Sequence, residues 1–333
     1  MINFVVKEMT CLRYFIPLVH EAFLRGVQSR FYVGSFDKYN CPFRHPKVLS
    51  YFVQRYQIEV LEIEKLKEAK ELTFYIEDVG IDQSGPDNKK IVLTYQNDFV
   101  NEGDHCYHNY IDSVDHVIFP SKFIAEYHKT VSDKNLYLGS PKYDISIDRR
   151  QVIEKYDLPD RDNILILFPK LRDLEKSNIL EILSHIKKMS CNAIIKTRGK
   201  DRVTSESMRG DRYFEDVSWF PHTTMELLAA SDLVINFGST AIKECVMMRK
   251  PVINFPIKPH NIEKTFPFLY EYSYCEQHQP NCGFKKFEES ARRLMSADHQ
   301  SAFDESIGNH LFDYHSSSKI LNFFEKEISH DKG

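Results

Sequence analysis

The chain has 333 residues, which is enough for two domains of ordinary size. Hydrophobic residues make up 42% and charged residues 28%, so the chain can bury a sizeable core and is not intrinsically disordered. Lys and Arg number 44 against 48 Asp and Glu, a net charge of -4. This balance argues against a nucleic-acid-binding protein, because neutralising phosphates requires a basic face.

The first half of the chain alternates short apolar strands with helical patterns, which is typical of βαβ units and parallel sheets. Helices are predicted at Leu12–Arg25 and, with a break near Gln57–Val60, at His45–Glu71. Strands are predicted at Ile2–Val6, Phe31–Ser35, Leu72–Ile76, Ile91–Tyr95, His116–Pro120 and Leu136–Gly139.

A polar, charged stretch at Pro141–Asp162 leads into a second βα series. The strands predicted there are Ile164–Phe168, Ala193–Lys196, Leu233–Phe237 and Pro251–Phe255, and the helices are Glu175–Met189, Thr223–Ala230, Ala241–Arg249, Phe284–Met295 and Asp304–Glu327. We therefore predict an α/β protein of two Rossmann-like domains, residues 1–145 and 146–310, that face a central cleft. Residues 311–333 are predicted to form a C-terminal helix that packs back on the first domain.

Three absences predict a cytoplasmic protein. No stretch approaches the roughly 18 consecutive apolar residues that span a bilayer. The N-terminus lacks the basic and apolar regions of a signal peptide. The seven cysteines are odd in number and scattered, which is typical of reduced thiols.

The segment most indicative of a ligand site is 231–244, where a buried strand runs into a Gly-Ser-Thr turn and then directly into a helix. Gly238 would let the backbone approach a ligand closely. The first amides of the helix would form an anion site, to which Ser239 and Thr240 add hydroxyl donors. Glu244 lies one turn further on and could accept hydrogen bonds from a ribose. An ordinary Ser/Thr cap with a solvated Glu is the alternative.

Cations follow two neighbouring strands of the same half. Lys196 and Arg198 stand at the end of one strand, and Lys170 and Arg172 follow the strand before it. Parallel sheets bind ligands at this edge, and Arg and Lys suit a diphosphate because Arg makes forked contacts and Lys acts as a point charge. Solvated basic loops are the alternative for each pair.

A loop before a predicted helix could hold a nucleobase. Phe220 and His222 are placed there to stack on or bracket a base, while Thr223 and Glu226 have the spacing of a capping box. Metal-capable side chains at Asp104–His108 and around Cys275 form no paired zinc framework, so no metal is expected.

These residues carry a family resemblance. The motifs are Lys-Thr-Arg at 196–198, Pro-His-Thr-Thr at 221–224, Ser-Asp-Leu-Val-Ile-Asn-Phe-Gly-Ser-Thr at 231–240 with Glu244, and Arg-Lys-Pro-Val-Ile at 249–253. Together they resemble the C-terminal half of GT-B glycosyltransferases, closest to surface- and capsular-polysaccharide transferases of the CDP-glycerol glycerophosphotransferase-like and Kdo-transferase-like groups. The UDP-GlcNAc 2-epimerases are relatives of these. The resemblance covers residues 115–325 at the level of motifs.

The resemblance implies a nucleotide-sugar donor bound by residues 146–310 and a glycan acceptor bound by residues 1–145. The diphosphate would lie at Ser239 and Thr240, the ribose at Glu244, and the base near Phe220 and His222. UDP stands ahead of CMP or CDP as the nucleotide. Such enzymes need no metal or other cofactor, because cations and the helix dipole neutralise the leaving phosphate.

Two departures from the family pattern refine this expectation. Many retaining members carry a second Glu eight residues before the ribose-binding one, where this chain has Asn236, and that favours an inverting mechanism. The glycerophosphotransferases tend to show Trp-His-Gly near Ile91–Tyr95, where this chain reads Thr-Tyr-Gln-Asn-Asp at 94–98. This argues against a glycerophosphate donor.

Inverting transfer needs a general base within hydrogen-bond reach of the acceptor hydroxyl. Asp98 ranks first because it follows the strand that aligns with the family's acceptor loop. Glu77 ranks second because it ends a predicted strand that faces the same cleft. Glu8, Asp78 and His20 are further candidates, and each of the five is also compatible with a structural or solvated role.

Two other functions stay open. A sugar-nucleotide 2-epimerase would act on the donor without an acceptor, but it needs further acids and a His that we do not identify. A catalytically inactive nucleotide-sugar-binding subunit would serve a partner transferase. Association with the inner face of the membrane or with a biosynthetic complex is compatible with each of these, whereas nucleic acid is not an expected partner.

Overall fold

The computed structural model describes residues 1–6, 11–34, 46–94, 106–159, 162–197, 203, 205–215, 222–257, 266–310 and 314–329. The chain forms two compact units. Unit 1 comprises Met1–Ile145 together with the returning segment His310–Gly333, and unit 2 comprises Ser146–Asn309.

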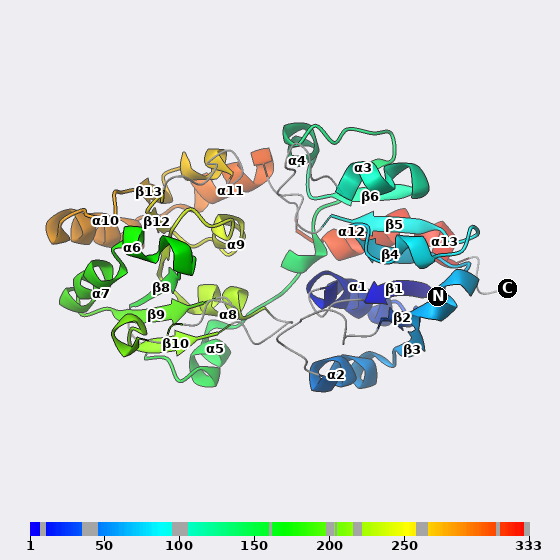
Figure 1. Cartoon of the computed structure of the whole chain (residues 1–333), viewed down its shortest axis with the longest axis horizontal. Helices are drawn as coiled ribbons and strands as arrows, with labels where there is room; N and C mark the ends of the chain where they lie inside the picture. The colour runs from blue at the N-terminus through cyan, green and yellow to red at the C-terminus, as the bar shows by residue number, and fades with distance from the viewer. Residues whose placement is uncertain are drawn as a thin grey trace. The chain divides into compact units, whose positions relative to one another are not determined.

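Unit 1 is built on a seven-stranded parallel sheet in the order β3-β2-β1-β4-β5-β6-β7 (Figure 1). Its strands are β1 (Ile2–Val6), β2 (Ser29–Val33), β3 (Glu59–Glu62), β4 (Thr73–Ile76), β5 (Lys90–Leu93), β6 (His116–Phe119) and β7 (Asn135–Tyr137). Its helices are α1 (Leu12–Leu24), α2 (Pro46–Tyr56), α3 (Cys106–Tyr110), α4 (Lys122–Tyr127), α12 (Ser316–Phe323) and α13 (Glu325–Ser329). The strand order reverses between β1 and β4.

The core of unit 1 lies around β1, all five of whose residues are buried, as expected inside a parallel sheet with both faces covered. The ring of Phe4 packs against three other aromatic rings. Its centroid lies 5.1 Å from that of Phe15 on α1, 5.8 Å from that of Phe31 and 5.5 Å from that of Phe74. The aromatic-rich composition therefore serves packing here.

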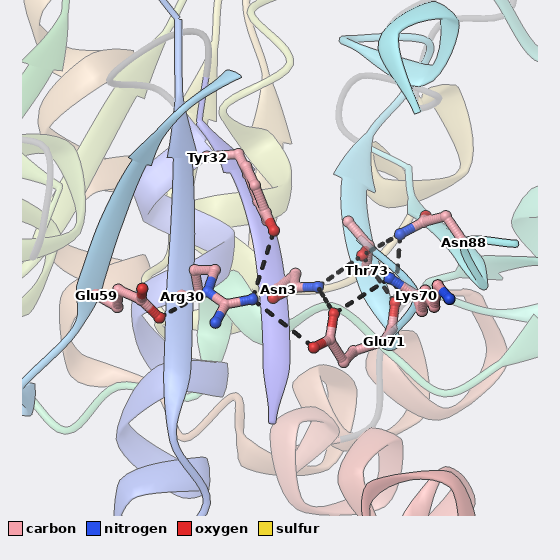
Figure 2. Close-up of polar contacts among 8 residues, drawn as sticks. All are labelled: Asn3, Arg30, Tyr32, Glu59, Lys70, Glu71, Thr73 and Asn88. Atoms are coloured by element: carbon pink, nitrogen blue, oxygen red, sulfur yellow. Dashed lines mark hydrogen bonds and ion pairs between the residues drawn. The ribbon is translucent and has the colours of Figure 1, made fainter. Parts of the chain in front are cut away.

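A polar network ties the unit 1 strands together on the side where they begin (Figure 2). Asn3 Nδ2 donates to Glu71 Oε2 (3.2 Å) and to Thr73 Oγ1 (3.2 Å), and Asn88 Nδ2 donates to Thr73 Oγ1 (2.7 Å). An ion pair joins Arg30 to Glu71 at 3.7 Å. The figure labels eight residues of β1–β4 and of the loops before β4 and β5: Asn3, Arg30, Tyr32, Glu59, Lys70, Glu71, Thr73 and Asn88. These bonds stabilise the edge of the sheet opposite the one at which parallel sheets bind ligands.

Unit 2 has a six-stranded parallel sheet in the order β10-β9-β8-β11-β12-β13 (Figure 1). Its strands are β8 (Asn163–Leu167), β9 (Asn192–Lys196), β10 (Arg212–Phe214), β11 (Leu233–Asn236), β12 (Val252–Asn254) and β13 (Cys275–Gln277). Its helices are α5 (Arg149–Lys155), α6 (Leu174–Ser177), α7 (Ile179–Lys188), α8 (Thr223–Ala230), α9 (Ile242–Met247), α10 (Phe284–Ser296) and α11 (Gln300–His310). Its core includes Ile164, Ile166, Ile195, Ile235, Phe255 and Phe287.

The predicted α/β class with parallel sheets is confirmed. Three strands, however, lie in stretches for which no strand was predicted. Glu59–Glu62 lies in a stretch predicted as mostly helical, and β10 and β13 were not predicted at all. Each of the three is an edge strand. An edge strand has one unpaired, solvated side, so it lacks the continuous apolar run that marks a central parallel strand.

Two predicted helices are interrupted. The prediction Glu175–Met189 is split into α6 and α7 at Asn178, which adopts the left-handed conformation with φ 52°. The prediction Asp304–Glu327 is split because α11 ends at His310, and His315, before α12, has φ 65°. Asn is among the residues that most readily adopt this conformation. No helix in the described ranges is both long and apolar enough to cross a bilayer.

Helix α12 of the returning segment packs against α1, the first helix of unit 1. Arg25, at the end of α1, donates from its guanidinium to Asn322 Oδ1 (2.7 Å) and Ser318 Oγ (2.8 Å) of α12. Ile320 and Phe324 are fully buried. The returning segment is thus part of the unit 1 core.

Candidate functional site

The strand order of unit 2 indicates where a ligand would bind. From β8 the chain builds β9 and β10 to one side and β11 to β13 to the other, so the topological switch point lies between β8 and β11. Open parallel sheets bind ligands outside the carboxyl ends of the strands at such a point. Lys170 and Arg172 follow β8, and Gly238–Thr240 follow β11. The topology therefore brings two of the predicted segments to one location.

The Gly238–Thr240 turn is held by side chains from two adjacent strands. Gly238 has φ +64°, and its N–H donates to Asn254 Oδ1 (3.0 Å). The N–H of Ser239 donates to Asn236 Oδ1 (3.2 Å), and that of Ala241 donates to Ser239 Oγ (3.3 Å). The turn is thus fixed before α9 begins.

A buried polar cluster lies under this turn. Asn236 Nδ2 lies 3.2 Å from the Ser239 carbonyl oxygen, 3.2 Å from Asn254 Oδ1 and 3.0 Å from the Tyr270 hydroxyl oxygen. The Tyr270 hydroxyl donates to the same Ser239 carbonyl (3.2 Å). Burial raises the pKa of Tyr270 well above its ordinary value, so this hydroxyl stays a donor. We call Asn236, Asn254 and Tyr270 the turn brace.

Asn254 and Tyr270 are not among the predicted site residues, although the sequence contains a signal for Asn254. The tetrapeptide Val-Ile-Asn-Phe occurs twice, at 234–237 and 252–255. The two copies lie in register on β11 and β12, with Asn236 beside Asn254, and the two Phe rings stack at 5.8 Å. Tyr270 comes from a short 3-10 helix, Pro267–Tyr270, and no local pattern marks it.

The turn offers a ligand different groups from those expected. The amides of residues 238, 239, 241, 242 and 243 all donate to acceptors within the turn and its brace. Of this stretch, only the Thr240 amide has no acceptor among the described residues. A ligand at the turn would therefore meet that amide and the Ser239 and Thr240 hydroxyls. No described atom lies within 4 Å of where a Cβ on Gly238 would stand, so the Gly238 backbone is open to close approach.

The helix after the turn carries two buried charges. Glu244 is 8% exposed and Lys243 is 4% exposed. The Lys243 ammonium lies 5.0 Å from the centroid of the Phe266 ring, a cation–π contact. Burial lowers the pKa of Lys243 to about 8, while neighbouring Glu244 acts in the opposite direction. Lys243 therefore keeps its charge at neutral pH beside an aromatic ring, although a cation opposes the dipole at this end of a helix.

The predicted cations have different environments. Lys196 is the last residue of β9, pairs in register with Leu167 of β8 and is buried. Lys170 precedes the short 3-10 helix Leu171–Asp173, in which Arg172 is exposed, 3.9 Å from the Asp173 carboxylate. Arg198 lies outside the described residues.

Of the loop before α8 that was predicted to hold a nucleobase, the structure describes only the last residue, His222. His222 is buried and directly precedes α8, whereas Phe220 lies outside the described residues. The predicted capping box at Thr223 and Glu226 is wrong, because His222 occupies the cap position. The Glu226 carboxylate instead accepts from Lys155 Nζ (2.7 Å) and from the Tyr156 hydroxyl. The Glu226 carboxylate thus pairs with a cation from α5.

In unit 1, Glu77 follows β4 beside the switch point between β1 and β4. It is buried, its backbone is left-handed with φ 51°, and its Oε2 accepts from the Tyr110 hydroxyl (3.1 Å). For a non-glycine residue this conformation costs of order 1 kcal/mol or more. Asp98 and Glu8 lie outside the described residues, Asp78 is exposed, and His20 contacts the Tyr56 ring.

The described residues contain no group of three or more His, Cys, Asp or Glu that could hold a metal. Of the metal-capable side chains noted in the sequence, His278 shares a hydrogen bond with Ser290 Oγ (2.9 Å). Cys275 and Cys282 are buried thiols. Asp104 and His105 are outside the described part of the chain.

No protein-family model and no curated protein matches this sequence, but solved structures match its fold. A glycotransferase of kitacinnamycin aligns over 98% of both chains with 10% identity and a TM-score of 0.61. A putative UDP-N-acetylglucosamine 2-epimerase from Listeria monocytogenes aligns over 99% of this chain and 96% of its own with 12% identity and a TM-score of 0.63. The wall teichoic acid polymerase TagF, in a structure soaked with CDPG, aligns over 100% of this chain and 90% of its own with 12% identity and a TM-score of 0.65.

These likenesses agree with the motifs in the second half of the sequence. At 10% to 12% identity they concern the arrangement of strands and helices and not the chemistry of individual residues. The chain forms two parallel-sheet units, and these structures match it over nearly its whole length. The chain has the two-domain GT-B fold that its motifs predicted.

Proposed function

We propose that this protein is a metal-independent, inverting glycosyltransferase that moves a sugar from a nucleotide-activated donor to a glycan acceptor. UDP is the first choice of nucleotide, ahead of CMP and CDP. The activity would serve surface-polysaccharide synthesis on the cytoplasmic side of the membrane, where the chain could join a peripheral membrane or biosynthetic complex.

The observation that carries this proposal is the braced Gly238–Thr240 turn at the unit 2 switch point. The turn combines hydroxyl donors, an open backbone at Gly238 and a carboxylate, Glu244, in the helix that follows. A nucleoside diphosphate presents two phosphates and two ribose hydroxyls, so donors followed by a carboxylate acceptor match its chemistry.

In the proposed reaction the acceptor hydroxyl attacks the anomeric carbon as the bond to the diphosphate breaks, which inverts the configuration. The leaving diphosphate gains negative charge, and the Ser239 and Thr240 hydroxyls with Lys170 and Lys196 would stabilise it. A carboxylate takes the proton of the acceptor hydroxyl, with Asp98 the first candidate and Glu77 the second. Asn236 supports single displacement, because its amide is engaged in the turn brace.

A thermal-shift titration with UDP, CMP, CDP, GDP and NAD, with and without EDTA, tests the donor site. A ligand that binds only the folded chain raises its stability by about 2.7 kcal/mol at a hundredfold excess over Kd. We expect a shift with UDP, CMP or CDP that survives EDTA. A shift with NAD alone, or with no nucleotide, would overturn the proposal.

Product analysis then separates transfer from the two other functions. Incubation of the chain with a nucleotide sugar and a glycan acceptor should release the free nucleotide of the donor only when both are present. Conversion of the donor without acceptor would indicate an epimerase instead. Tight binding with no turnover for any acceptor would indicate a binding subunit.

A further inference from the structure

The turn brace has an arrangement that a generic buried polar cluster would not need. Asn236 and Asn254 occupy equivalent final positions on adjacent strands and are 0% and 2% exposed. Each uses its side-chain oxygen to accept a backbone N–H of the turn, from Ser239 and Gly238 respectively. Because a backbone N–H requires an oxygen acceptor, these two bonds also fix which end of each amide is the oxygen.

The two asparagines nevertheless have different tasks. Asn254 acts only as an acceptor here, because its Oδ1 receives both the Gly238 N–H and Asn236 Nδ2. Asn236 both accepts and donates, and its Nδ2 hydrogens are shared among the Ser239 carbonyl, Asn254 Oδ1 and the Tyr270 hydroxyl. The backbone of Ser239 is thus held at its N–H by Asn236 and at its carbonyl by Asn236 and Tyr270.

We infer that Asn236, Asn254 and Tyr270 are positioning residues that hold the Ser239–Thr240 turn in the conformation that receives the donor diphosphate. This inference rests on the proposed function, because it takes the turn to be the diphosphate site. The brace pre-orients the Ser239 and Thr240 hydroxyls, so the nucleotide does not have to order the turn when it binds.

The difference between the two asparagines yields a sharp test. In Asn254→Asp the new side chain still accepts from Gly238 and Asn236, whether it is ionised or protonated. In Asn236→Asp an oxygen replaces the donor Nδ2. The ionised side chain has no hydrogen to donate, and the protonated one has a single hydrogen. The Ser239 carbonyl and Asn254 Oδ1 then face an oxygen instead of an N–H donor. Both substitutions bury a carboxyl group, so both are expected to lower stability.

A matched control exists at the opposite end of the same sheet. Asn192, also buried, begins β9 and donates from Nδ2 to Asn163 Oδ1 (2.7 Å). Asn192→Asp therefore replaces a donor in an equally buried pair that is remote from the turn. It should lower stability without changing nucleotide binding.

The experiment measures Kd for the nucleotide that stabilises the native chain, by titration calorimetry at a temperature where every variant is folded. We expect Asn236→Asp to weaken binding by about tenfold or more, the size of effect that an unsatisfied buried group produces. Tyr270→Phe should weaken it less, and Asn254→Asp and Asn192→Asp by less than about threefold. Binding by Asn236→Asp equal to that of Asn192→Asp would overturn the inference while leaving the proposed function intact.

Hydrogen exchange gives a readout that needs no ligand. The Gly238 and Ser239 amides should exchange faster in Asn236→Asp than in Asn192→Asp at matched global stability. Equal exchange would overturn the inference. If the native chain binds no nucleotide, the proposed function fails, and the ligand part of the inference fails with it.

Discussion

The carboxylate of Asp144 receives the backbone N–H of Ser316, 172 residues further along the chain, at 3.1 Å, and also that of Ser317 at 2.5 Å. Ser316 and Ser317 begin α12, and His315, at its cap position, makes no side-chain capping bond among the described residues. Asp144 therefore caps this helix from a distant part of the chain. The bond lies next to the place where the chain passes into unit 2.

Removing this cap should destabilise unit 1. Substituting a capping Asp by Ala costs about 0.5–2 kcal/mol, and we expect Asp144→Ala to fall in that range. Urea unfolding monitored by circular dichroism measures the change. Asp148→Ala, which removes the local cap of α5 in unit 2, is the matched control, and it should leave exchange of the α12 amides unaltered. An Asp144→Ala chain as stable as the native one would contradict the assignment.

Glu71 should make stability depend on acid pH. Burial alone would raise its pKa, but hydrogen bonds from its own amide, Asn3 and the Lys70 amide, together with the charge of Arg30, bring the pKa below its usual 4.5. A carboxyl whose pKa is lower in the folded state adds stability above its unfolded pKa and loses it as pH falls through the folded one. The stability difference between the native chain and Glu71→Gln should therefore shrink from pH 6 to pH 3. Urea titrations at a series of pH values test this, and a constant difference would contradict it.

Lys243 should make stability depend on pH in the alkaline range, where stability also rises with pH. Burial lowers its folded pKa to about 8 from the usual 10.5, so between these values the unfolded chain holds more protons and stability rises with pH. Lys243→Met removes this contribution. Its gain in stability over the native chain should be larger at pH 7 than at pH 10. Thermal unfolding of both chains at each pH measures the gain, which would be constant if Lys243 were solvated.

Glu244→Ala should weaken nucleotide binding by about tenfold or more, because hydrogen bonds from ribose hydroxyls to a charged acceptor are worth about 1.5–3 kcal/mol. Glu226→Gln is the control, since Glu226 is an equally buried carboxylate of unit 2 that pairs with Lys155. Titration calorimetry with the nucleotide and with its 2′,3′-dideoxy analogue separates the ribose contribution. If the native chain does not discriminate against the analogue, Glu244 does not bind the ribose.

Substitution of the general base should lower kcat without weakening nucleotide binding. General-base catalysis contributes about 10²–10⁴-fold, so Asp98→Asn should lose transfer on this scale while its nucleotide Kd stays unchanged. The same assay on Glu77→Gln compares the second candidate. Unchanged turnover in the Asp98 variant removes that assignment, and loss in the Glu77 variant alone transfers the role to Glu77.

Local sequence patterns predicted the central elements well, because elements that are buried consist of continuous runs of apolar residues or of residues with a regular apolar period. The strand Ile2–Val6 and the helix Thr223–Ala230 have the predicted bounds. The edge strands that were not predicted are stabilised by contacts with a neighbouring strand, which a local pattern does not show. Strand β3, Glu59–Glu62, pairs with β2, and an ion pair joins Arg30 to Glu59 (2.7 Å). Helix α5 was not predicted, because its seven residues are mainly polar and Val152 is the one that is buried.

The candidate site was predictable where a motif is contiguous and not where it is assembled by tertiary contacts. The Gly-Ser-Thr turn is visible as a sequence, whereas its brace joins Asn236, Asn254 and Tyr270 from three separate segments. The capping box failed because Lys155, a cation from another helix, competes for the Glu226 carboxylate. Asp98, Arg198 and Phe220 stay predictions, since they lie outside the described residues.

The discontinuity of unit 1 has a consequence for biosynthesis. Unit 2 is contiguous in the chain, and the last strand of its sheet, β13, ends at Gln277, so this sheet can be complete before α12 is made. Unit 1 begins first but lacks Ile320 and Phe324, both of which it buries completely, until α12 is made. The earlier-translated unit is therefore the later one to finish folding, and until then the surface of α1 that α12 covers is open to chaperones and to aggregation.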